Sequence, residues 1–220
     1  MTKAKRLFDI VGATLGLVLL WPVFIVVAGA VAQEDDGPVF FRQERVGTGG
    51  RTFRMWKFRT MVVNAEQIGS LLTTGEDPRI TVVGRWLRRA KLDELPQLIN
   101  VLRGEMSLVG PRPEVPRYVS LYDDSQREVL ALTPGITDPA SLTYFDESVE
   151  LAGASDPERF YVESVLPEKI RLNCDYAAHA SVWTDFQVVA QTIGRLLGCV
   201  LAAPNGAPLG RASQQSRHPC

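Results

Sequence analysis

A run of 23 uncharged, mostly apolar residues near the start of the chain, Ile10 to Ala32, constrains the fold more than any other feature. At 1.5 Å of rise per residue, such a helix is about 34 Å long, enough to cross the hydrocarbon core of a bilayer. A signal peptide has a shorter apolar core. The run therefore predicts a retained membrane helix. Cations precede it and acids follow it: Lys3, Lys5 and Arg6, then Glu34, Asp35 and Asp36.

Pro22 divides this run almost evenly, leaving 12 residues before it and 10 after it. A proline inside a helix removes one backbone hydrogen bond and clashes with the preceding turn, so a kink is expected. Two arrangements remain open at this point. A kinked helix that crosses the bilayer would put residues 34–220 on the far side if the N-terminal cations stay inside. A helix that bends at Trp21 and Pro22 would return to the face it entered.

Composition excludes several classes of protein. Of the 220 residues, 45% are apolar and 22% charged, and the net charge is −1. These values exclude a disordered or collagen-like chain and give no reason to expect nucleic acid as a partner. The charge is unevenly distributed, however: residues 42–91 hold 11 Lys and Arg against 4 Asp and Glu, and residues 114–169 hold 4 against 12. A basic centre of this kind indicates a site for a polyanion.

The three cysteines form no CxxC pair, which argues against a disulfide framework or a zinc cluster and favours a reducing, cytosol-facing location. They are Cys174, Cys199 and Cys220. The two histidines, His179 and His218, have no partner at ligand spacing, and we interpret both as structural or incidental.

Residues 39–61 have the pattern of a β-hairpin, with the turn-forming cluster Gly47–Gly50 between two strand-like runs. Alternation places Lys57 and Arg59 on one face with three apolar side chains, Phe53, Met55 and Met61. Cations in such a place are costly unless an anion or a carboxylate meets them. The alternative is that their stems cover apolar surface at an edge while their charges remain in water.

Residues 80–90 have the periodicity of an amphipathic helix. The apolar stripe consists of Val83, Trp86, Leu87 and Ala90, and the opposite stripe of Arg85, Arg88 and Arg89. A membrane-surface helix and an anion-binding face are the functional interpretations of this arginine stripe. A merely solvated cationic face is commoner in general, but the membrane segment upstream favours an interfacial role.

The next helix is predicted from the spacing of Leu95, Leu98, Ile99 and Leu102, with Gly104 as its end. Asp93 stands where an N-cap is expected, so a capping role is one interpretation. The second is chemical: Asp93 and Glu94 are adjacent carboxylates that the helix dipole and nearby cations keep ionised. Such a pair can bind a hard cation such as Mg²⁺, and one member can attack phosphorus as a nucleophile.

Two prolines flank Arg112 in the loop 110–114 and limit where its guanidinium can point. A pre-aimed arginine suits phosphate recognition, or equally a buried ion pair with Glu114 or another acid.

The remaining chain is predicted to be mostly helical, so the fold class is an α-rich α+β protein with a small β-hairpin, a membrane helix and amphipathic interfacial helices. Helices are expected over residues 116–133, 156–172 and 181–200, the last a candidate for membrane association. Three parts follow: residues 1–36 as the membrane helix, 37–202 as the main domain, and 203–220 as a disordered tail rich in Pro, Gly, Ala and Ser.

Taken in order, these motifs resemble a family, the bacterial sugar transferases, which are monotopic polyprenyl-phosphate phosphoglycosyl transferases. The resemblance covers roughly residues 3–195. The motifs that carry it are KRLFD, GPVFFRQERVG, KFRTM, DPRITVVGRWLRRAKLDELPQLINVLRGEMSLVGPRPE and LTPGIT. The later stretch DPERFYVESVLPEKIRLNCDY looks like the small, single-domain branch of that family.

The resemblance implies transfer of a sugar 1-phosphate from a UDP-sugar to polyprenyl (undecaprenyl) phosphate, with release of UMP, as the first membrane step of surface glycan synthesis such as that of an exopolysaccharide. It also implies a re-entrant helix, because UDP-sugars are cytosolic and a spanning helix would strand residues 34–220 on the wrong side. The expected location is the cytoplasmic face of the bacterial inner membrane, in contact with membrane lipid. A homodimer is left open.

By the same resemblance, Asp93 is the nucleophile that forms a covalent phosphosugar intermediate in a ping-pong course, and Glu94 serves metal binding or proton handling. Mg²⁺ would be held by this pair and bridge the diphosphate. The side chains expected to hold the phosphates are Lys57, Arg59, Arg88 and Arg112.

The chain departs from the family pattern at Trp21, at Lys91, and at Asp138–Ser141 after the LTPGIT motif. Contacts near the last segment are therefore not carried over. The alternative function is a non-catalytic, membrane-anchored scaffold that binds anionic lipid through Arg85, Arg88 and Arg89.

Overall fold

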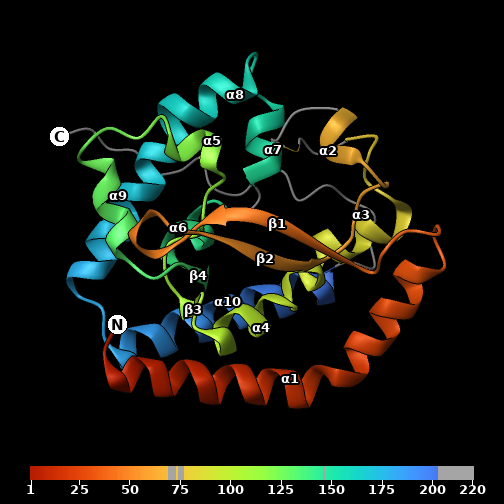
Figure 1. The fold of residues 1–220 in the computed structure, drawn as a ribbon, viewed down its shortest axis with the longest axis horizontal. Helices are drawn as coiled ribbons and strands as arrows, with labels where there is room; N and C mark the ends of the chain where they lie inside the picture. Colours follow the sequence, from red (N-terminus) through yellow and green to blue (C-terminus); the bar gives the residue numbers. More distant parts are fainter. Residues whose placement is uncertain (69–72, 74–76, 146, 203–220) are drawn as a thin grey trace.

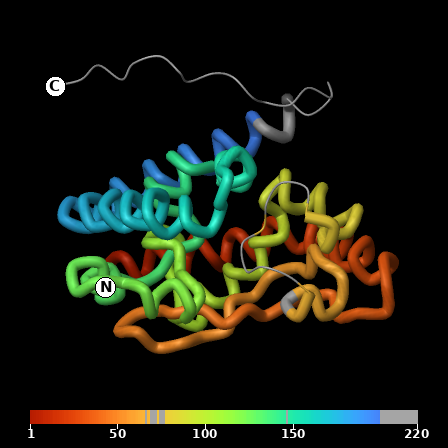
Figure 2. Tube along the Cα trace, turned by 90° about the horizontal axis from the view of Figure 1, so that it is seen from above, coloured from red at the N-terminus to blue at the C-terminus, as the bar shows by residue number. Residues whose placement is uncertain are grey.

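The computed structural model describes residues 1–68, 73, 77–145 and 147–202, so the expected disordered tail lies outside the described residues. The fold is the expected helix-rich α+β arrangement (Figure 1). A long helix runs along one edge, and a two-stranded hairpin crosses the middle of the molecule. The view from above places the hairpin and the C-terminal helices on opposite sides of the molecule (Figure 2).

The N-terminal helix α1 (Lys3–Ala32) is longer than the apolar run, because Thr2 caps it and its first turns carry the cations. Pro22 lies inside it, and Figure 1 shows the helix bending in its second half. Among the described residues, α1 is the one helix long and apolar enough to cross a membrane. Much of its apolar surface is uncovered, with Leu19 72% and Val26 70% exposed. This uncovered surface supports association with a membrane.

Both halves of α1 pack against the rest of the protein. In the first half, Ala13 belongs to an apolar cluster with Met55 and Val101. In the second half, beyond Pro22, Val27 packs with Leu87. The bend therefore lets one helix contact a single body on both sides of the proline.

Polar contacts secure the first half of α1. Asp9 is fully buried and accepts hydrogen bonds from Ser107 Oγ (2.9 Å) and from the Leu108 amide (3.0 Å). Lys5 forms an ion pair with Asp185 (2.5 Å). These contacts tie α1 to strand β3 (Ser107–Val109) and to helix α10 (Val182–Ala202).

The predicted hairpin is confirmed. Strands β1 (Phe40–Val46) and β2 (Thr52–Phe58) pair antiparallel and are joined by the short helical turn η1 (Thr48–Gly50). The turn needs glycine, because Gly49 and Gly50 both have positive φ angles, of 68° and 77°. Met55, on the inward face, is fully buried.

Helix α3 (Val82–Arg89) follows the hairpin and is shorter than predicted. Within its apolar stripe, Leu87 is fully buried, whereas Trp86 is 58% exposed. The turn η2 (Leu92–Glu94) then leads into helix α4 (Gln97–Arg103). Gly104 ends α4 with a φ of 79°, as predicted. Strand β3 follows and pairs in parallel with β4 (Gly135–Thr137).

Short helices fill the C-terminal half around an apolar core that includes Tyr118, Val129, Tyr161 and Leu166. The single helix predicted over residues 116–133 was wrong, because the chain forms two short helices there with a turn between them. The helix predicted over residues 156–172 forms and continues to Ala178, with a π-helical turn just before Pro167. These elements and one earlier helix are α2 (Ala65–Ile68), α5 (Pro116–Val119), η3 (Gln126–Ala131), α6 (Pro139–Thr143), α7 (Glu147–Ala152), α8 (Pro157–Phe160), η4 (Tyr161–Val165) and α9 (Leu166–Ala178).

Candidate active site

Asp93 and Glu94 lie on the turn η2, between α3 and α4. The chain enters this turn through Lys91, which has a left-handed backbone (φ 54°). The cap position of α4 is taken by Pro96, so the interpretation of Asp93 as an N-cap was wrong. Asp93 is only 7% exposed, and its carboxylate has no hydrogen bond or ion pair with any other described residue. An acid so little exposed, whose carboxylate makes no hydrogen bond or ion pair with the described residues, is unusual and is a candidate for a functional role.

Glu94, in contrast, is held by two cations. Arg112 donates to both carboxylate oxygens, with Nη1 to Oε2 at 3.1 Å and Nη2 to Oε1. Lys57 Nζ lies 3.3 Å from Oε1. Arg112 is therefore in a partly buried ion pair, as one of the two interpretations of its loop required, and the partner is Glu94 instead of Glu114.

Glu114 has other contacts. Its carboxylate lies 3.7 Å from Arg45 Nη1 and accepts a hydrogen bond from the Tyr161 hydroxyl. The loop that carries Arg112 is thereby fixed from behind by the C-terminal helices, which helps to orient the guanidinium toward Glu94.

The two adjacent acids have opposite electrostatic properties. Burial raises the pKa of Asp93, and the charge of Glu94 raises it further, to about 6, although Lys57 and Arg88 act against this. Burial acts in the same direction on Glu94, but Arg112 and Lys57 outweigh it and hold the pKa of Glu94 well below its usual range. At neutral pH both acids are ionised. Glu94 is neutralised by its partners, and Asp93 keeps an available charge.

Lys57 reaches this site from the inward face of β2, and burial lowers its pKa to about 8 in spite of the opposing charge of Glu94. Lys57 is thus paired with the Glu94 carboxylate, which is the first of the two arrangements expected for the cations on this face of the hairpin.

Arg88 is separated from the other arginines of α3. Its Nε donates to Thr60 Oγ1 at 2.8 Å, and its charge acts on Asp93, whereas Arg85 and Arg89 are exposed. Gly84 allows this approach, because a Cβ there would lie 2.1 Å from the Thr60 carbonyl oxygen. The arginine stripe that the scaffold alternative requires is therefore divided between the site and the surface.

Arg59 lies elsewhere. It is buried beside Gly37 and forms an ion pair with Asp35, just beyond the end of α1. The structure thus brings five of the six predicted residues together and puts Arg59 at the joint between α1 and the hairpin. The five are Asp93, Glu94, Lys57, Arg88 and Arg112.

Asn100 is a supporting residue that the sequence analysis missed. It is fully buried in α4, and its side chain accepts from the Trp56 amide (2.9 Å) and donates to the Arg54 carbonyl (2.9 Å). These bonds fix β2 beside α4 and so set the distance between Lys57 and the acid pair. Its signal in the sequence was an amide between the apolar Ile99 and Val101 of a predicted helix.

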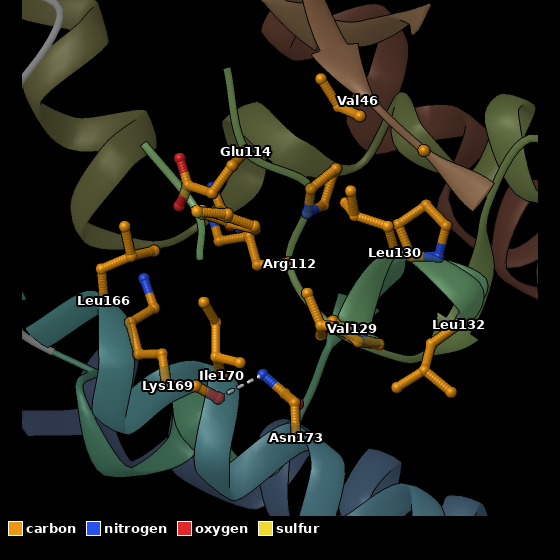
Figure 3. Close-up of a pocket in the computed structure, with 15 residues that line it drawn as sticks. Val46, Arg112, Glu114, Val129, Leu130, Leu132, Leu166, Lys169, Ile170 and Asn173 are labelled. Carbon is orange, nitrogen blue, oxygen red and sulfur yellow. Dashed lines mark hydrogen bonds between the residues drawn. The ribbon is translucent and has the colours of Figure 1, made fainter. Parts of the chain in front are cut away.

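A small cavity lies behind Arg112, between its loop and α9 (Figure 3). Its volume is about 40 Å³, and its polar lining includes Arg112, Glu114, Lys169 and Asn173. This volume has room for a few water molecules and not for a sugar ring. The cavity is therefore too small to be a sugar-binding pocket, and Asp93 does not line it.

Mg²⁺ prefers oxygen ligands and commonly takes one or two carboxylates together with phosphate and water oxygens. No group of three or more acidic, histidine or cysteine side chains suited to a metal occurs in the described part of the chain. Asp93 offers a free carboxylate, and Glu94 stands beside it with its oxygens engaged by cations. This set fits an ion that draws most of its ligands from a diphosphate and water.

Residues 1–199 match the family described as bacterial sugar transferase. A UDP-glucose:undecaprenyl-phosphate glucose-1-phosphate transferase of Xanthomonas campestris pv. campestris is 38% identical over 200 residues, covering 89% of this chain and 39% of that protein. A putative undecaprenyl-phosphate N-acetylgalactosaminyl 1-phosphate transferase of Bacillus subtilis is 42% identical over 133 residues, covering 60% of this chain and 70% of the relative.

The length of the match differs between relatives. The chain spans 35–41% of the length of three curated relatives, among them a galactosyl transferase of Streptococcus agalactiae that is 36% identical over 201 residues, or 86% of this chain. The relatives act on different sugars by name, so the match does not select one sugar for this protein.

Proposed function

The chain belongs to the bacterial sugar transferase family, and from this membership and the site geometry we propose that it transfers a sugar 1-phosphate from a UDP-sugar to polyprenyl phosphate, with release of UMP. The observation that carries the proposal is the unpartnered, buried Asp93 between Lys57 and Arg88, beside a Glu94 that Arg112 already neutralises. A carboxylate in this setting is suited to covalent catalysis on phosphorus.

In the first half-reaction, an Asp93 carboxylate oxygen attacks the β-phosphorus of the UDP-sugar. The bond from that phosphorus to the bridging oxygen breaks, UMP leaves with the bridging oxygen, and a sugar phosphate remains joined to Asp93. In the second half-reaction, an oxygen of the polyprenyl phosphate attacks the same phosphorus. The bond to Asp93 breaks, which restores the carboxylate and yields the diphosphate-linked lipid.

Positive charge around Asp93 has to offset the repulsion between a carboxylate and two phosphorylated substrates. Lys57, Arg88 and Arg112 supply that charge in fixed positions, which is the arrangement that stabilises charge in a transition state. Mg²⁺, held through Asp93 and Glu94, would neutralise part of the diphosphate charge when bound.

The proposal is tested by measuring UMP release from a panel of UDP-sugars by the detergent-solubilised protein with Mg²⁺, with and without undecaprenyl phosphate. Sustained release that needs the lipid, with a single stoichiometric burst in its absence, is the expected result. Repeated turnover without lipid would identify a hydrolase instead, and no release with any donor would contradict the catalytic proposal.

A bell-shaped pH dependence of kcat/KM is expected for this reaction. Below pH 6 the rate falls because the Asp93–Glu94 pair takes up a proton and Asp93 loses its nucleophilic form. Above pH 8 it falls because Lys57 loses its charge beside the phosphates. A pH profile of UMP release checks both limbs, and Lys57→Arg is expected to remove the alkaline limb. A profile flat from pH 5 to 9 would contradict these roles.

For α1 we propose a re-entrant course at the cytoplasmic face of the bacterial inner membrane. The support is that both halves of the bent helix pack on the same body, Ala13 before Pro22 and Val27 after it. A helix that crosses the bilayer carries its second half away from the body that its first half contacts.

Cysteine labelling in spheroplasts separates the two arrangements of α1. We expect that Ala4→Cys and Asp36→Cys, in a chain whose three native cysteines are replaced by serine, both react with a membrane-impermeant maleimide only after permeabilisation. Labelling of Asp36→Cys alone in intact spheroplasts would show a spanning helix and reject the re-entrant one.

A further inference from the structure

Phe145, in the segment between α6 and α7, holds two cations near one aromatic ring. Arg195 Cζ lies 4.6 Å from the ring centroid, and Lys91 Nζ lies 5.2 Å from it. Arg195 comes from α10, and Lys91 from the turn that carries Asp93. Three segments far apart in the sequence therefore converge next to the proposed nucleophile.

Neither cation has a carboxylate partner within the described residues. Arg195 donates to the Leu142 carbonyl oxygen, and Lys91 lies over the ring, with its charge also acting on Asp93 and Glu94 from beyond ion-pair distance. By comparison, Lys57, Arg59 and Arg112 each form an ion pair with an acid. Cation–π attraction at an exposed position is weak beside the attraction of a cation for a phosphate. A phosphate that contacted both cations would gain charge-assisted hydrogen bonds that the ring does not offer.

The backbone conformation of Lys91 also supports a functional role at this position. Its φ of 54° is left-handed, a conformation that is strained for a residue with a Cβ. Such conformations persist where the surroundings enforce them and are concentrated at functional sites. Lys91 precedes Asp93 by two residues, and its charge is one of those acting on Asp93. An anion bound by Lys91 would therefore lie beside the nucleophile.

We propose that Lys91, Phe145 and Arg195 form a subsite for a phosphate group of a substrate bound at Asp93. The subsite rests on the proposed function and adds Lys91 and Arg195 to the positive charge that Lys57, Arg88 and Arg112 place around the acid pair. The ligand chemistry is a phosphate, which belongs either to the diphosphate of the UDP-sugar or to the headgroup of the polyprenyl phosphate.

Kinetics of the two half-reactions separate these sources. The variants are Arg195→Gln and Lys91→Gln, and the matched control is Arg103→Gln, because Arg103 also lies over an aromatic ring, that of Trp56 (5.7 Å). Each subsite variant is expected to raise the KM of one substrate about tenfold, because one charge-assisted hydrogen bond to that substrate is lost. A rise in the donor concentration needed for the UMP burst assigns the subsite to the UDP-sugar. A rise in the KM of the lipid assigns it to the acceptor.

Binding by calorimetry, with the full chain in detergent, gives a readout that does not need turnover. The probes are UDP for the donor and dodecyl phosphate for the acceptor. Weaker binding of one probe by both subsite variants, and not by Arg103→Gln, supports the subsite. This holds even if the wild type releases no UMP, because a lack of UMP release would reject only the proposed function. If the KM and Kd values of both subsite variants stay within twofold of those of Arg103→Gln, the subsite is overturned. The proposed transferase function would still stand if the wild type is active. A wild type that neither turns over nor binds either probe would overturn both.

Discussion

Asp93→Asn is expected to lower turnover by roughly 10⁴-fold and to abolish the burst of UMP, because an amide does not replace a carboxylate nucleophile. The substitution keeps the shape of the side chain. Single-turnover release of UMP, with protein in excess over the UDP-sugar, measures the loss directly.

The same variant is expected to be more heat-stable than the wild type at neutral pH. Folding raises the pKa of Asp93 to about 6, chiefly through burial, so the folded state binds a proton more tightly than the unfolded state does. The tighter proton binding by the folded state stabilises the protein at low pH, and this contribution is lost as the pH rises through 6. At pH 7.5, the ionised, buried Asp93 therefore lowers the free energy of unfolding by roughly 3 kcal/mol. Asparagine at this position carries no such cost. Loss of activity together with an unchanged or higher Tm therefore distinguishes a missing nucleophile from a folding defect.

Asp156→Asn is the matched control for this experiment. Asp156 caps α8 through a bond to the Arg159 amide, and asparagine caps a helix equally well. Turnover within twofold of wild type is expected for it. An Asp93→Asn protein that keeps a tenth or more of the wild-type rate would exclude Asp93 as the nucleophile.

Local patterns in the sequence were sufficient for the elements that depend on neighbouring residues. Gly49 and Gly50 predicted the hairpin turn, and Gly104 predicted the end of α4, because each position requires a backbone that other residues rarely adopt. The grouping of the acid pair with Arg112 came from the family resemblance and not from a local pattern, and the structure pairs Arg112 with Glu94. Helices that depend on tertiary packing were less predictable, and the apolar spacing over residues 116–133 concealed a turn between α5 and η3.

The partners of charged side chains were the least predictable feature. Alternation placed Lys57 and Arg59 on the same face, yet one meets Glu94 and the other Asp35. The strand ends at Phe58, so alternation no longer applies at Arg59, and contact with the end of α1 decides its direction. Arg195 could not be related to Lys91 from local patterns either, because 104 positions separate them and the packing of α10 brings them to one ring.

Arg112→Met is expected to destabilise the protein by about 3 kcal/mol, the lower end of the cost of breaking a buried ion pair. The methionine keeps the approximate length of the side chain but removes the guanidinium that mainly holds the Glu94 carboxylate. The remaining ion-pair partner of Glu94 is then Lys57, at 3.3 Å. For a chain of this size the loss corresponds to a decrease in Tm of roughly 6–12 °C. The decrease in Tm is measured by thermal unfolding in detergent, monitored by circular dichroism.

Arg117→Met removes an arginine of the same size from an exposed ion pair with Glu158, and a Tm within about 2 °C of wild type is expected there. The double variant Arg112→Met, Glu94→Gln should recover most of the lost stability, because the unpaired charge that causes the loss is gone. Turnover should stay low in that double variant, since the phosphates still lack the guanidinium. Equal decreases in Tm for Arg112→Met and Arg117→Met, or a further decrease in the double variant, would mean that Arg112 contributes through packing alone and that its pairing with Glu94 does not hold the site together.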